Sequence, residues 1–255
     1  MTTRETPWPQ GTPSWVDLMV RDPKAAGEFY SQLFGWQVRD LGEEAGGYAI
    51  AEKSGRPAAG IGPIPEGQQM PAVWTTYIAA DDVDDIVAKV ISSGGQTLMP
   101  AMDVMDAGRM AVVSDSAGAV FGLWQAREHK GAEIVNEPGA LTWNENMTRD
   151  YDGARKFYAD VFGYEYEDVG DESFKYSVLN LSGSPVGGIG EIGANLPAQV
   201  PPHWMPYFSV ADTDETLERA QALGAQVIMP AQDTPYGRLA TLLGPQGERF
   251  SVIAG

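Results

Sequence analysis

The chain has no cysteine, only two histidines and no long apolar run. The lack of thiols excludes disulfides, iron–sulfur clusters, thiolate zinc sites and a cysteine nucleophile. No stretch approaches the roughly 18 uninterrupted apolar residues that a membrane-spanning helix needs. The N-terminal residues MTTRETPWPQGTP are polar and rich in proline, unlike the apolar core of a secretory signal. We therefore expect a cytoplasmic protein that does not enter a membrane.

Basic residues are also scarce. There are 17 Lys and Arg against 35 Asp and Glu, which gives a formal net charge of -18. A protein that binds nucleic acid or an anionic membrane surface needs positive charge to neutralise phosphates. The sequence therefore predicts neither kind of partner and indicates a soluble, self-repelling surface.

The sequence contains a long internal repeat. The segment SWVDLMVRDPKAAGEFYSQLFGW from Ser14 matches TWNENMTRDYDGARKFYADVFGY from Thr142 at an offset of 128 residues. Later matches keep an offset of 130, as for Trp74 and Trp204, and then of 129. Because the offset changes so little, we expect two copies of one architecture. The predicted units span residues 12–126 and 140–255, and the polar residues 127–139 form a linker.

Each unit itself contains a strand–helix pattern twice. In the first unit a strand at 15–20 leads to Asp22, a typical helix N-cap, and the helix stops at Gly35. Short strand-like segments follow, and the pattern starts again with a helix that begins after Asp82. Each unit therefore reads as strand–helix–three strands, repeated. The chain is predicted to hold four βαβββ modules and to belong to the α+β class.

The motif D-P-x-x-A-x-x-F-Y-x-x-L-F-G-W after the first strand resembles the module opening of the vicinal oxygen chelate superfamily. That superfamily includes glyoxalase I, the bleomycin- and fosfomycin-resistance proteins and the extradiol dioxygenases. Asp115, Gly118 and Phe121 give the D-x-x-G-x-x-F strand entry of a second module. The W-x-[DE] openings are closest to a tandem branch common in actinobacteria. The resemblance implies two tandem half-open barrels with outer helices, each enclosing a ligand cavity.

In the metal-dependent members of this superfamily, the ligands are a His or Gln on each module's first strand and a Glu on its last strand. These positions fall on residues without imidazole or carboxylate groups, which transition metals require. The two histidines, His129 in the linker and His203 before a strand, are expected to be surface or structural residues. The sequence therefore predicts no metal and no cofactor. The positions that correspond to the ligands are Trp15, Thr75, Gly122, Trp143, Met205 and Ser251.

Candidate site residues follow from strand alternation, which puts every second residue on one face. Val16, Leu18 and Val20 suit the helix-packed face, so Trp15 and Asp17 should line the concave face.

The second unit places Trp143 and Glu145 in the same way. It also turns Asn144, Asn146 and Thr148 toward the helices, and alternation alone does not explain these polar residues.

A carboxylate beside an indole in an apolar cavity has its pKa raised by desolvation. Asp17 and Glu145 are therefore candidates for a general base or for an acceptor of a ligand hydroxyl. The plain alternative is that the tryptophans are core residues and the carboxylates are structural. Arg109 and Arg238 are either anchors at a cavity mouth or members of surface ion pairs. The other predicted lining residues are Tyr48, Thr75, Tyr77, Trp124, Tyr176, Met205, Tyr207 and Ser251.

Three functions remain open at this point. The first is metal-independent binding of a small apolar or aromatic molecule, with a role in antibiotic resistance or a secondary-metabolite pathway by analogy with the superfamily. The second is an enzyme that uses Asp17 or Glu145 as a general base: a glyoxalase-like lyase, a dioxygenase- or hydroxylase-like protein, or a cofactor-free cyclase or isomerase. The third is a structural protein with filled cavities. A monomer and a homodimer are both compatible with the sequence.

Overall fold

The computed structural model describes residues 2–171, 174–193 and 199–255 of the chain. The first unit begins with β2 (Pro13–Val20), α1 (Pro23–Phe34), β3 (Gln37–Asp40), a 3₁₀ turn at Glu43–Ala45 and β4 (Ala49–Lys53). It continues with β5 (Arg56–Pro63), β6 (Val73–Ala79), α2 (Val83–Ser92), β7 (Gln96–Val104), β8 (Gly108–Ser114) and β9 (Val120–Ala126). This is the predicted strand–helix–three-strand order, twice.

The second unit repeats that order. Its elements are β11 (Leu141–Thr148), α3 (Tyr151–Phe162), β12 (Glu165–Asp168), β13 (Tyr176–Leu181), β14 (Ser184–Glu191), β15 (His203–Ser209), α4 (Thr213–Ala222), β16 (Gln226–Thr234), β17 (Gly237–Leu243) and β18 (Arg249–Ala254). Two short strands, β1 (Thr2–Thr3) and β10 (Ile134–Val135), pair with each other beside β11.

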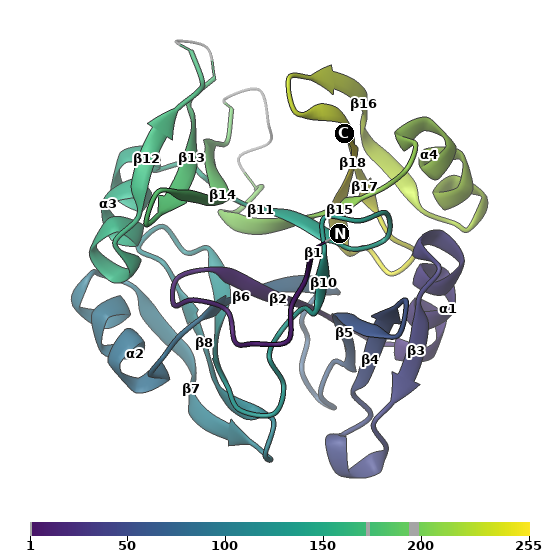
Figure 1. The fold of residues 1–255 in the computed structure, drawn as a ribbon, viewed down its shortest axis with the longest axis horizontal. Coiled ribbons are helices and arrows are strands. Elements are labelled where there is room, and N and C mark those ends of the chain that lie inside the picture. The colour runs from purple at the N-terminus through teal and green to yellow at the C-terminus, as the bar shows by residue number, and fades with distance from the viewer. Residues whose placement is uncertain (1, 172–173, 194–198) are drawn as a thin grey trace.

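Each unit forms one curled, mixed sheet (Figure 1). The strand order is β3-β4-β5-β2-β6-β9-β8-β7 in the first unit and β12-β13-β14-β11-β15-β18-β17-β16 in the second. Consecutive modules therefore join, through antiparallel pairs of their first strands, β2 with β6 and β11 with β15. Because the end strands of each order pair on one side only, each sheet is an open cup and not a closed barrel. We call the concave faces the first cup and the second cup.

The helix ends confirm the predicted caps. The Asp22 carboxylate accepts a hydrogen bond from the Ala25 backbone N–H at 3.0 Å, and Gly35 ends α1 with φ at 72°. Such a left-handed residue suits glycine because it has no Cβ to clash. Asp150 and Gly163 bound α3 in the same way.

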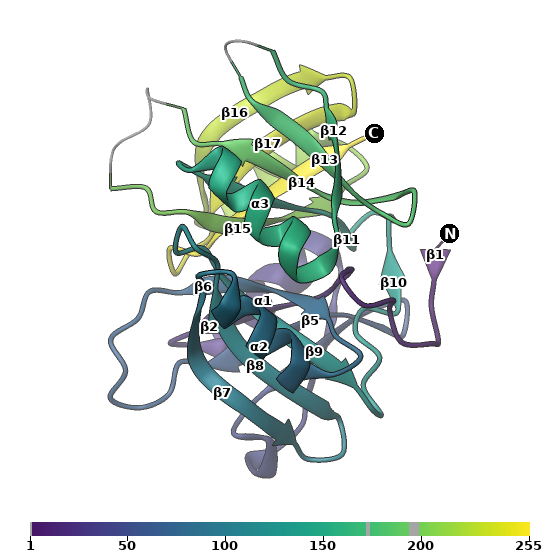
Figure 2. The ribbon, with the colours of Figure 1, turned by 90° about the vertical axis from the view of Figure 1, so that its left-hand side faces the viewer.

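The structure has two hydrophobic cores, and each core combines residues of both units. One joins the first module with the fourth, for example Tyr30 with Phe250, and the other joins the second module with the third. Helix α1 accordingly lies beside α4, and α2 beside α3 (Figure 1). The two units are stacked with their convex sides together (Figure 2). The cups therefore face away from each other.

The polar residues of β11 have a place in this junction. The Asn144 side-chain oxygen accepts a 2.8 Å hydrogen bond from the Thr76 hydroxyl of the first unit. The Asn146 amide donates to the hydroxyl of Tyr158 at 3.2 Å. Thr148 accepts from the backbone N–H of Asp150. Because each of these three side chains makes a hydrogen bond in the interior, the alternation holds although the residues are not apolar.

The predicted linker is an ordered part of the structure. Ala132 and Ile134 are buried, and β10 adds to the second sheet. The backbone N–H of Ala132 also donates to the carbonyl of Ser14, at the start of β2, at 2.7 Å. Within the described residues, no helix is both long and apolar enough to span a bilayer.

Candidate functional site

The floor of the first cup carries the buried carboxylate of Asp17. The hydroxyl of Tyr48 donates to its Oδ2 at 3.4 Å, and the indole N–H of Trp15 donates to the same hydroxyl at 3.1 Å. Burial raises the pKa of Asp17 to about 7, although hydrogen bonds from Tyr77, Tyr48 and Thr75 oppose the shift. The Asp17 carboxyl group, set among aromatic side chains, therefore changes between its neutral and its ionised form near pH 7.

The second cup repeats this arrangement around Glu145. The hydroxyl of Tyr207 donates to its Oε1 at 3.1 Å, and the indole of Trp143 donates to the hydroxyl of Tyr176 at 3.0 Å. Burial again raises the pKa of Glu145 to about 7, against hydrogen bonds from Tyr176 and Tyr207. A phenol, an indole and a carboxyl group thus form one polar cluster on each concave face.

The two cluster tyrosines each lie over a glycine of the neighbouring strand. A Cβ added at Gly60 on β5 would overlap the phenol oxygen of Tyr48. A Cβ at Gly188 on β14 would overlap that of Tyr176 in the same way. The Gly-Ile-Gly sequences at 60–62 and 188–190 are the signal in the sequence that marks these tyrosines as cup residues.

The remaining predicted lining residues lie on the central strands. Thr75 is opposite Asp17 in the β2–β6 ladder, and Met205 is opposite Glu145 in the β11–β15 ladder. Ser251 is opposite Tyr207, and its hydroxyl is 2.9 Å from that of Thr241. Tyr77 and Trp124 are almost fully buried in the first unit.

The two candidate arginines are engaged elsewhere. The guanidinium of Arg109 pairs with Asp84 at 2.8 Å and with Asp103 at 3.2 Å. Arg238 makes the equivalent pairs with Asp214 and Asp233, at 2.8 and 3.0 Å. These carboxylates raise the pKa of both arginines, chiefly through hydrogen bonds. Of the two alternatives that the sequence left open, the ion pair is the one observed.

The metal positions implied by the superfamily do not fit a metal here. Gly122 stands where a last-strand carboxylate is expected, and a Cβ there would overlap the ring of Tyr77. The tyrosine ring therefore fills the space that a metal ligand would occupy. Trp15 and Trp143 offer N–H donors that are already bonded to tyrosines. Over the part of the chain that the structure describes, no three His, Asp or Glu side chains cluster as a metal site requires.

One residue of the first cup was missed by the sequence reasoning. His129, from the linker, makes T-shaped ring contacts with Trp15 and Trp124. The centroid of its ring is 4.4 Å from that of Trp15 and 5.5 Å from that of Trp124. Burial lowers its pKa to about 4, so the imidazole is neutral at pH 7. Nothing in the linker sequence signals this contact, because the chain returns over the cup only in the tertiary structure. His203 starts β15, with Nδ1 2.8 Å from the carbonyl of Pro201.

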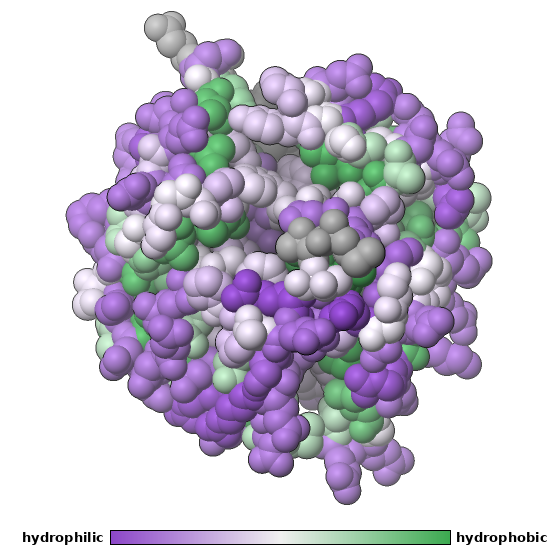
Figure 3. All heavy atoms as spheres, viewed as in Figure 1, coloured by the Kyte–Doolittle hydropathy of each residue, from purple (hydrophilic) through white to green (hydrophobic). Residues whose placement is uncertain are grey.

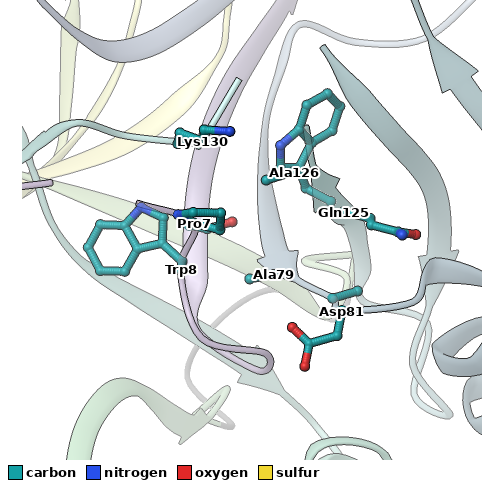
Figure 4. Close-up of a pocket in the computed structure, with 10 residues that line it drawn as sticks. Pro7, Trp8, Ala79, Asp81, Gln125, Ala126 and Lys130 are labelled. Carbon is teal, nitrogen blue, oxygen red and sulfur yellow. The ribbon is translucent and has the colours of Figure 1, made fainter. Parts of the chain in front are cut away.

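A cleft of about 220 Å³ lies where the N-terminal segment crosses the ends of β6 and β9. Figure 4 shows Trp8 and Lys130 on one side of it, with Gln125 and Asp81 opposite. The indole N–H of Trp8 donates to the carbonyl of Ala132 at 3.0 Å, which fixes this segment. The cleft is small and was not predicted from the sequence.

Sequence comparison places these two cups in a known family. The model of the Glyoxalase/Bleomycin resistance protein/Dioxygenase superfamily matches residues 12–123 and 141–252. The chain belongs to this superfamily. It is 46% identical over 250 residues to the "Putative glyoxylase CFP32" of Mycobacterium tuberculosis, covering 96% of this chain and 95% of that protein. It is 38% identical over 257 residues to the "Anthracycline biosynthesis protein DnrV" of Streptomyces peucetius, covering 95% and 93%.

Solved structures of the superfamily share the fold at low sequence identity. The Mn(II)-bound glyoxalase of Novosphingobium aromaticivorans gives a TM-score of 0.66 at 15% identity and covers 96% of this chain and 82% of that chain. The 2,3-dioxygenase LapB of Pseudomonas sp. KL28 gives 0.65 at 16% identity, covering 96% and 93%. These similarities confirm the predicted superfamily and its tandem α+β fold.

Proposed function

We propose that the protein binds a small aromatic molecule that carries a hydroxyl group, on a concave face and without a metal. The observation that carries the proposal is the carboxyl group set among phenols and indoles, at Asp17 and again at Glu145. A ligand hydroxyl would donate to the carboxylate, and its ring would pack on the neighbouring indole. Apolar walls with a few fixed polar groups are the usual composition of a small-molecule site.

Two findings support a role in the metabolism of such molecules. The relative from Streptomyces peucetius carries anthracycline biosynthesis in its name. The residues at the metal positions, Trp15, Thr75, Gly122, Trp143, Met205 and Ser251, favour recognition over the metal chemistry of other superfamily members. We accordingly propose a place in a secondary-metabolite pathway or in resistance to an aromatic antibiotic, acting on a soluble small molecule.

The test compares two ligands that differ only in the hydrogen-bond donor, 2-naphthol and 2-methoxynaphthalene. Quenching of tryptophan fluorescence should show tighter binding of 2-naphthol, by about tenfold, because only it can donate to the carboxylate. The double variant Asp17→Asn/Glu145→Gln should lose this preference. The exposed pair Asp152→Asn/Glu218→Gln is the matched control and should keep it. Equal affinity of the wild-type protein for both ligands would contradict the proposal.

A second function, an enzyme that moves a proton, is favoured by one observation. The pKa of about 7 at Asp17 and Glu145 is suited to a general base. Such a base would remove a C–H proton next to a carbonyl, as an isomerase or cyclase does. The test is exchange of the acidic C–H of 2-tetralone for deuterium in D₂O, followed by NMR. Exchange no faster with the wild-type protein than with Asp17→Asn/Glu145→Gln would rule out this function for that substrate.

A further inference from the structure

The floors of the two cups differ in their access to solvent. In the first cup Trp15 is 3% exposed and Asp17 is 5% exposed. In the second cup the corresponding Trp143 and Glu145 are only partly buried. In Figure 3 the surface is hollowed in the upper half, on the side of the second unit. The floor of the second cup is therefore the more exposed of the two.

The linker accounts for the closed floor of the first cup. After β9 the chain turns back across one end of this cup before it enters β10 (Figure 1). Its backbone is fixed on one side by the N–H groups of Arg127 and His129, which donate to the carbonyl of Ala107 at 3.0 Å. It is fixed on the other side by Ala132, whose N–H donates to the carbonyl of Ser14.

Between these two attachments, His129 enters the cup. Its ring meets Trp15 at 4.4 Å, and its carbonyl accepts a 3.0 Å hydrogen bond from the indole of Trp124. The imidazole thus occupies space beside Trp15 that an aromatic ligand would otherwise use.

The closed cup retains the chemistry of a binding site. Oδ1 of Asp17 and Nε2 of His129 are both buried and lack a hydrogen-bond partner among the described residues. Unpaired buried polar atoms are costly and rare in a part of a protein that serves packing alone. Asp17 therefore keeps a free acceptor position of the kind that a ligand hydroxyl would use.

We infer that the two cups have different roles, because the linker residue His129 closes the first cup and leaves the second as the binding site for a hydroxylated aromatic molecule. This inference rests on the proposed function for the class of ligand. It adds which cup binds the ligand, how many sites the chain has and which residue closes the other cup. Removal of the imidazole should open a second site around Asp17.

The experiment is isothermal titration calorimetry with 2-naphthol. The wild-type protein should bind one equivalent. Glu145→Gln should weaken binding about tenfold, whereas the exposed Asp152→Asn should leave the affinity unchanged. His129→Ala should add a second equivalent, and the matched linker variant Glu128→Ala should not. Two equivalents in the wild-type protein, or loss of binding with Asp17→Asn instead of Glu145→Gln, would overturn the inference.

A measurement without ligand separates this inference from the proposed function. Carbodiimide with glycine ethyl ester labels accessible carboxyl groups, and mass spectrometry locates the label. Glu145 should be labelled several times faster than Asp17 in the wild-type protein, and His129→Ala should raise the rate at Asp17. Equal rates in the wild-type protein would refute the closed first cup. Absence of 2-naphthol binding together with unequal labelling would refute the proposed function alone.

Discussion

The hydroxyl of Tyr158, in the second unit, donates a 2.9 Å hydrogen bond to Oδ2 of Asp115, in the first unit. The indole of Trp204 donates to the same hydroxyl at 2.8 Å. The other core repeats this contact in the opposite sense, since Tyr30 of the first unit donates to Glu248 of the second at 3.1 Å. Each unit thus supplies a tyrosine to a buried acid of its partner unit.

The two acids do not occupy matching positions in the repeat. At the offset of 129, Asp115 corresponds to Gly244, and Glu248 corresponds to Ala119. A Cβ at Gly244 would overlap the Glu248 carboxylate, so this longer side chain reaches the place where a side chain at 244 would lie. The carboxyl group therefore keeps its place in the structure, although the residue that supplies it has moved by four positions along the chain.

Tyr158→Phe should destabilise the protein by about 1–3 kcal/mol, because Asp115 and Trp204 each lose a buried partner. Denaturant unfolding followed by circular dichroism measures the free energy of unfolding. The exposed Tyr236→Phe is the control and should change it little. A loss no larger than that of the control would show that the contact between the units contributes nothing measurable.

Asp17→Asn should stabilise the protein at alkaline pH. Its raised pKa means that the folded protein keeps a proton that the unfolded chain releases, so stability falls as pH rises from about 4 to about 7. Asparagine carries no such proton, and the variant should be more stable by about 2–4 kcal/mol at pH 8 and nearly unchanged at pH 4. Unfolding titrations at both pH values test this, with the exposed Asp152→Asn as control. An unchanged pH dependence would contradict the burial of an ionisable group.

Gly188→Ala should disrupt the second cup. The added methyl group would overlap the phenol oxygen of Tyr176 and displace the ring from the cluster around Glu145. We expect at least about tenfold weaker 2-naphthol binding and a destabilisation of about 1–3 kcal/mol. Gly190→Ala should have a smaller effect, because its added Cβ would lie 3.0 Å from the sulfur of Met147 and 3.1 Å from the Tyr176 ring, whereas the Cβ at Gly188 would lie 1.9 Å from the phenol oxygen. Equal effects of the two substitutions would show that Tyr176 does not position the site.

Binding of 2-naphthol should strengthen between about pH 6 and pH 8. The Glu145 carboxyl group accepts a hydrogen bond from the ligand best when it is ionised, and its pKa is about 7. The association constant should rise by up to about tenfold over this interval. Calorimetry at three pH values measures the change, and Glu145→Gln should abolish it. A wild-type affinity that does not depend on pH would remove Glu145 from the contact.

Arg238→Ala should leave ligand affinity unchanged. The guanidinium is paired with Asp214 and Asp233 on the outer side of the second unit and does not contact the Glu145 cluster. The same titration with 2-naphthol is the measurement, with Arg249→Ala as a second surface control. A clear loss of affinity with Arg238→Ala would restore the arginine as an anchor at the cavity mouth.

The amino-acid sequence by itself determined the elements and their repetition. Helix α1 is set by its cap Asp22 and its stop Gly35, and strand β2 by the alternation that turns Asp17 to the concave face. These features depend on residues close together in the chain, where backbone preference and periodicity decide. The repeat then carries the same features to the second unit, including Glu145.

Only the tertiary structure decided how the side chains meet. Tyr48 reaches Asp17 from a different strand, Tyr158 reaches an acid of the other unit, and His129 returns from the linker onto Trp15. The same holds for the two arginines, whose partners are fixed by helices that pack beside their strands. Such contacts join residues far apart in sequence, and their selection depends on packing and burial that no local pattern encodes.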